Sequence, residues 1–108
     1  MADETAPANG ASVWPIVLKL RKMVIANGEE TKELKFREPT PADVERCGDP
    51  VNIDFLSGDT PKISYDAKAM SMMMAILAGV PPSTIKQMHI KDWESAKLML
   101  TGPFMPDL

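Results

Sequence analysis

Two residues in this sequence are of types that often perform acid–base or nucleophilic chemistry, and each type occurs once. His89 is the one histidine, and the nearest helper in sequence is Asp92, three residues further along. Cys47 is the one cysteine, so it can form neither an internal disulfide nor a Cys-based metal site. No nucleophile or oxyanion motif accompanies either residue. We therefore expect a structural or surface histidine and a cysteine buried as a small apolar residue.

The acidic residues and glycines do not form a recognisable ligand site. Asp49, Asp54 and Asp59 recur every five residues, but they lack the spacing and the closing Glu of a calcium loop. They fit turns instead. The sequence has no glycine-rich phosphate loop, no dinucleotide fingerprint and no Cys/His metal spacing. We therefore predict that the protein is not an enzyme, uses no cofactor and holds no metal.

Charge and hydropathy argue against nucleic acid and membrane as partners. The chain has 12 basic and 15 acidic residues, a net charge of -3, and so no basic field for phosphate backbones. No apolar stretch reaches the roughly 18 residues that cross a bilayer. The length of 108 residues suits one domain. We expect a disordered leader over residues 1–12, one α+β domain over 13–105 and a tail over 106–108.

Residues 14–37 predict a β-hairpin or small meander. Apolar residues alternate, and after Arg21-Lys22 the apolar positions change to Met23 and Ile25, which indicates a bulge. Asn27-Gly28 supplies a turn signal, and both a two-residue and a four-residue loop fit. The residues expected to face the core are Trp14, Ile16, Leu18, Leu20, Leu34 and Phe36.

Proline and capping residues then mark a short helix. Thr40 can cap it, Pro41 suits its first position, and Asp43 sits where a capping-box acid reaches back. This helix should run to about Cys47. Residues 48–61 are rich in turn residues and predict a long loop. The apolar residues expected to pin this loop to the core are Ile53, Phe55 and Leu56.

A second helix should open at Asp66 and end at Gly79. It is apolar nearly all round, so it is either central to the fold or partly exposed for a partner. A short helix or turn over 83–88 and a last helix over about 91–100 follow. The expected fold is therefore α+β, with an N-terminal β-hairpin or small antiparallel sheet packed on about three to four short helices.

Methionine enrichment is the feature that most favours a binding function. The chain has nine methionines, and four of them lie between Met70 and Met74. Flexible Met side chains can repack against varied apolar shapes, although an apolar helical stripe can equally be core. The predicted partner-binding residues are Met70, Met73, Met74, Leu77, Ile85, Met88 and Trp93.

Four short strings stand out along the chain: Leu18-Lys19-Leu20, Leu34-Lys35-Phe36-Arg37-Glu38-Pro39-Thr40, Leu77-Ala78-Gly79-Val80-Pro81-Pro82 and Asp92-Trp93. In order and spacing these strings resemble the Mu-like and P2-like phage tail assembly chaperones. The most specific are Arg-Glu-Pro-Thr before a helix, and Gly-Val-Pro-Pro followed ten residues later by Asp-Trp. The resemblance covers about residues 14–104, and the stretch 48–65 is longer and richer in proline than in the family.

The resemblance implies a helper outside the virion, acting in the cytoplasm of the bacterial host. Its partner would be the long, apolar, helical tape measure protein, which it would keep soluble until tail tube subunits polymerise around it. The tail tube protein and a second copy of the chain are further expected partners. The alternative hypothesis is a small structural component of the tail or neck.

Overall fold

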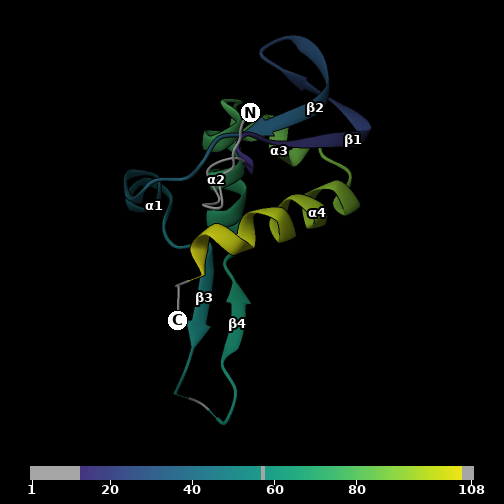
Figure 1. Cartoon of the computed structure of the whole chain (residues 1–108). Coiled ribbons are helices and arrows are strands. Elements are labelled where there is room, and N and C mark those ends of the chain that lie inside the picture. The colour runs from purple at the N-terminus through teal and green to yellow at the C-terminus, as the bar shows by residue number, and fades with distance from the viewer. Residues whose placement is uncertain (1–12, 57, 106–108) are drawn as a thin grey trace, which may run out of the picture.

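The computed structural model describes residues 13–56 and 58–105. The expected leader over 1–12 and tail over 106–108 lie outside the described residues. The elements, shown in Figure 1, are β1 (Ile16–Ala26), β2 (Glu29–Phe36), α1 (Pro41–Cys47), β3 (Val51–Asp54), β4 (Lys62–Tyr65), α2 (Ala67–Ala78), α3 (Pro82–Lys86), α4 (Ile90–Thr101) and the 3-10 turn η2 (Gly102–Phe104). The predicted α+β class is confirmed, and a second small sheet is added to it.

The N-terminal hairpin turns at Asn27-Gly28, as predicted. Both residues have positive φ, 54° and 83°, which is the backbone of a type I′ turn. Ala26 pairs with Glu29, so the loop has two residues and the four-residue alternative is excluded. The register shifts between Lys19 and Val24, which confirms the predicted bulge.

The face that β1 turns to the core after the bulge differs from the prediction. Val24 and Ala26 are buried, whereas Met23 and Ile25 are exposed. The irregular stretch between the paired segments spans residues 20–23, an even number of positions. Even-numbered residues therefore still face inward after the bulge, and the predicted change to Met23 and Ile25 was wrong.

A side chain from α4 holds the bulge in β1. The buried Asp92 carboxylate accepts hydrogen bonds from the backbone N–H groups of Arg21 at 2.9 Å and Lys22 at 3.4 Å. The Arg21 guanidinium Nε lies 3.2 Å from the other carboxylate oxygen. A bulge leaves N–H groups without strand partners, and a buried carboxylate requires donors. The Asp92 carboxylate therefore supplies the acceptor that the N–H groups of the bulge lack, and these N–H groups supply donors to the buried carboxylate.

A second cluster fixes the join between β2 and α1. The Thr40 N–H and hydroxyl donate to Oδ2 of the buried Asp43 at 2.8 and 3.1 Å. The Arg37 guanidinium donates to both carboxylate oxygens, at 2.9 and 2.8 Å. The hydrogen bonds from Arg37 and Thr40 hold the pKa of Asp43 far below its ordinary value, although burial acts in the opposite direction.

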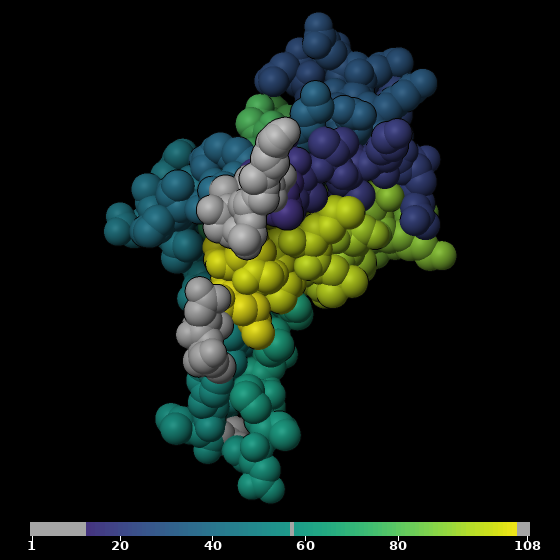
Figure 2. All heavy atoms as spheres, viewed as in Figure 1, coloured from purple at the N-terminus to yellow at the C-terminus, as the bar shows by residue number. Residues whose placement is uncertain are grey.

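Where the sequence predicted a loop over 48–61, β3 and β4 pair as an antiparallel hairpin. Val51 pairs with Tyr65 and Ile53 with Ile63, which makes one face of the hairpin apolar. The hairpin projects from the body of the molecule (Figures 1 and 2). The residues expected to pin this segment behave differently: Ile53 is half-buried and packs on the core, Phe55 is exposed, and Leu56 is 95% exposed. The anchoring role was therefore wrong for Phe55 and Leu56, which lie beyond the buried base at Val51.

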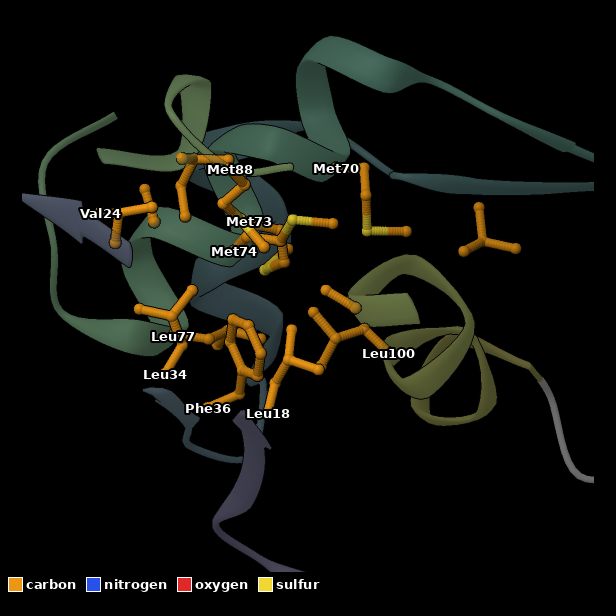
Figure 3. Packing of buried hydrophobic residues seen from close by; sticks show 14 residues of the cluster. Leu18, Val24, Leu34, Phe36, Met70, Met73, Met74, Leu77, Met88 and Leu100 are labelled. Carbon is orange, nitrogen blue, oxygen red and sulfur yellow. The ribbon is translucent and has the colours of Figure 1, made fainter. Parts of the chain in front are cut away.

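The core is built around α2, whose two ends were predicted correctly. The Asp66 carboxylate accepts a hydrogen bond from the Ala69 N–H at 3.1 Å, and Gly79 ends the helix in the left-handed conformation. The buried residues around α2 (Figure 3) include Leu18, Val24, Leu34 and Phe36 from the first hairpin, Met70, Met73, Met74 and Leu77 from α2 itself, and Leu100 from α4. The helix is therefore central to the fold, as the first of the two alternatives had it, while Met72 on another side of the helix stays 40% exposed.

Candidate functional site

The residues predicted to bind a partner fall into two groups in the structure. The first group, Met70, Met73, Met74 and Leu77, is buried in the core. The second group, Ile85, Met88 and Trp93, lines a hollow between α2, α3 and α4. Partner binding by the first group stays a prediction that would require α2 to separate from its neighbours. Ile85 and Met88 are themselves buried in the core, 2% and 9% exposed, and Trp93 is half-buried, so the second group forms the floor of this hollow.

Two adjoining hollows form one groove along α2, α3 and the start of α4, which we call the α2–α3 groove. The first, of about 370 Å³, is lined by Ala67, Ser71, Ile85, Lys86, Met88, Ile90 and Trp93. The second, of about 310 Å³, is lined by Ala67, Lys68, Ser71, Met72, Pro82 and Lys86. They share Ala67, Ser71 and Lys86, so they lie next to each other along α2 and α3.

Hydrogen bonds fix the walls of the groove. The Trp93 indole N–H donates to the Ser71 hydroxyl at 3.0 Å, which joins α4 to α2. The buried Thr84 hydroxyl donates to the Ile25 carbonyl at 2.7 Å, and the Gln87 side chain accepts from the Ile25 N–H at 2.8 Å. These two bonds hold α3 on β1. The groove is therefore preformed, as sites for apolar ligands usually are.

The rim of the groove carries two exposed apolar residues that the sequence reasoning did not place in the site. Met72 of α2 is 40% exposed, and Ile90 at the start of α4 is 63% exposed. The sequence held a partial signal for Met72, because the polar residues Lys68 and Ser71 share its side of α2 and interrupt an otherwise apolar helix. This mixed face is the one that α2 turns to the groove.

His89 and Cys47, which were considered for chemistry, lie where they contribute to the structure. The His89 Nδ1 accepts a hydrogen bond from the Lys91 N–H at 3.0 Å and caps α4. Burial raises the pKa of the half-buried Cys47 thiol, and the negative charge of Asp43 adds to this rise. The thiol therefore stays protonated at neutral pH, which makes it a poor nucleophile.

Within residues 13–56 and 58–105, no three His, Cys, Asp or Glu side chains gather so that they could hold a metal ion. None of the helices in that part of the chain is long and apolar enough to cross a membrane.

A family model described as phage tail assembly chaperone proteins, E, or 41 or 14, matches residues 18–102. No curated protein and no solved structure matches the chain. The matched range contains the whole α2–α3 groove and both hydrogen-bonded clusters, at Asp43 and at Asp92.

Proposed function

The chain belongs to the family of phage tail assembly chaperones, and we propose that it binds apolar helical segments of the tape measure protein in the α2–α3 groove. Proteins of this family assist assembly and are not enzymes. In this proposal, binding covers apolar surface on the tape measure protein and keeps that protein soluble until the tail tube forms. The observation that carries the proposal is a preformed apolar groove with exposed rim residues.

The groove has the features that helix-in-groove binding requires. Its floor presents the buried or half-buried apolar side chains of Ile85, Met88 and Trp93. An amphipathic helix can place anchors at every third or fourth position into such a floor. At the rim, the flexible thioether of Met72 can adapt to anchors of different shape. A long helical tape measure protein would present many segments with similar but not identical apolar side chains, so an adaptable groove suits it.

In this proposal, the chain binds the tape measure protein in the cytoplasm of the bacterial host. The tail tube protein is a second partner in this proposal, because its polymerisation would displace the chaperone from the tape measure protein. Self-association of the chain is a further expectation. No observation on the described residues favours the alternative of a structural component of the tail or neck.

The groove is tested by two matched charge substitutions in α4. Ile90 and Leu98 are both exposed aliphatic residues, 63% and 68%, but Ile90 lies on the groove and Leu98 does not. An Asp at position 90 must lose water when a helix docks, which is unfavourable for a charge. Acid in the first turn also suits the helix dipole, so Ile90→Asp should stay folded. In co-expression with the tape measure protein, we expect Leu98→Asp to keep it soluble and Ile90→Asp to lose most of that effect.

Two results would count against the proposal in different ways. If the wild-type chain leaves the tape measure protein insoluble, the proposed function is wrong. If both variants protect it equally, the function can stand but the groove is not its site. Circular dichroism of both variants controls for folding.

A further inference from the structure

The groove is positively charged at both walls, although the whole chain is acidic. Lys68 of α2 and Lys86 of α3 line it, and no lining residue is acidic. Among the described residues, neither lysine forms an ion pair. The chain as a whole carries a net charge of -3. The two lysines therefore set a local charge opposite to that of the molecule.

The acidic residues closest in sequence to the groove are engaged elsewhere. The Asp66 carboxylate caps α2 through the Ala69 N–H. Asp92 binds Arg21, and Glu94 pairs with Lys97 at 2.8 Å. None of these carboxylates pairs with Lys68 or Lys86 in the described chain, so the two ammonium groups are available to a ligand.

We propose that the α2–α3 groove selects helices whose apolar stripe is bordered by Glu or Asp. This inference rests on the proposed function and adds the chemistry of the preferred partner. A helix lying between α2 and α3 places its apolar stripe on the floor and its bordering residues at the walls. Acidic borders meet Lys68 and Lys86, whereas basic borders meet like charge.

The two lysines act mainly on specificity. Exposed ion pairs add little affinity, because water screens them and ordering long side chains opposes them. Complementary rim charges nevertheless speed the encounter, and like charges reject wrong partners. Apolar contacts on the floor would thus supply most of the affinity, and the lysines would choose among apolar helices of similar shape.

The test uses two synthetic amphipathic helical peptides with the same Leu/Met stripe, bordered by Glu in one and by Lys in the other. Their dissociation constants with the full chain are measured by fluorescence anisotropy. At low ionic strength we expect the Glu peptide to bind about tenfold more tightly. Near 1 M salt the Debye length falls to about 3 Å, and the preference should fall to about twofold or less.

A charge-reversed variant and a matched control complete the test. In Lys68→Glu/Lys86→Glu the preference should reverse toward the Lys peptide. Lys19→Glu/Lys32→Glu changes the net charge equally, but these exposed residues lie on the first hairpin, outside the groove. The control should keep the wild-type preference.

The outcomes separate the selectivity from the function. Equal binding of both peptides at low salt overturns the selectivity and leaves the proposed groove intact. Loss of the preference in the control variant also overturns it, because the net charge would then be the cause. Failure of the wild-type chain to bind either peptide contradicts both the selectivity and the proposed site.

Discussion

Replacing Met73 by Asp should abolish the folded state, whereas the same change at Met72 should leave it intact. Met73 is fully buried in the centre of the core, and Met72 is 40% exposed at the rim of the groove. A carboxylate at position 73 would lie among apolar side chains without a partner, at a cost of several kcal/mol. Folded domains are stable by only about 5–15 kcal/mol, so this change is enough to unfold a small one.

Urea unfolding followed by circular dichroism measures both effects. If Met73→Asp does not fold, Met73→Ala keeps the comparison quantitative, with an expected loss of about 2–5 kcal/mol in the free energy of unfolding. Met72→Ala should lose under about 1 kcal/mol, as surface changes usually do. A Met73→Asp chain that unfolds cooperatively near the wild-type midpoint would show that α2 is not the centre of the core.

Replacing Asp43 by Asn should lower the free energy of unfolding by about 1–2 kcal/mol at neutral pH. Asn keeps the shape of the side chain but removes the charge that binds the Arg37 guanidinium through two hydrogen bonds. The Thr40 N–H would also lose an ionised acceptor at the start of α1. The Arg37 side chain is half-exposed, so hydrogen bonds to water replace part of the hydrogen bonding that its guanidinium loses.

This difference should depend on pH in a defined direction. The pKa of Asp43 is lowered by folding from an ordinary value of 3.8, so its contribution is fully present above about pH 5. Below pH 4 the unfolded chain takes up the proton before the folded chain does, and the contribution declines. Residue 43 does not titrate in the Asn variant. We therefore expect unfolding free energies of the two chains to converge between pH 5 and pH 2, and a constant gap over that range would contradict the assigned ion pair.

Turn and capping residues predicted the ends of those elements that are set by residues close together in the sequence. Asn27-Gly28 fixes a turn because both residues accept positive φ, and Thr40-Pro41 begins a helix because of capping and a preset φ. The hairpin of β3 and β4 escaped prediction for a physical reason. Its strands have four residues each, too few for alternation to show, and their pairing spans a stretch of turn residues.

The proposed binding surface could be predicted only in part, because it depends on how three helices pack. α2 is apolar on nearly every side, so its sequence does not decide which side meets the core. Packing places Met73 inside and Met72 at the groove, one residue apart. The predicted residues Ile85 and Met88 of the groove come from a short segment. Its orientation is set by hydrogen bonds with Ile25 of β1, to which the Thr84 hydroxyl donates and from which the Gln87 side chain accepts.

The strings that carry the family resemblance have structural tasks. Arg37 and Thr40 bind Asp43, Gly79 ends α2, and Asp92 holds the bulge in β1. Pro82 and Trp93 of the same strings line the α2–α3 groove. The strings thus include residues that hold the fold and residues of the proposed site, and the packing of the helices distinguishes the two.

Site-specific photo-crosslinking tests the central claim most directly. A photoreactive amino acid is placed at position 72 or 90 of the groove, and at 98 or 99 on other parts of α4, in cells that also make the tape measure protein. Met72 and Met99 are each 40% exposed, so they form a matched pair. The account predicts cross-links to the tape measure protein from positions 72 and 90 and few or none from 98 and 99. Cross-links from 98 and 99 as strong as those from 72 and 90 would contradict it.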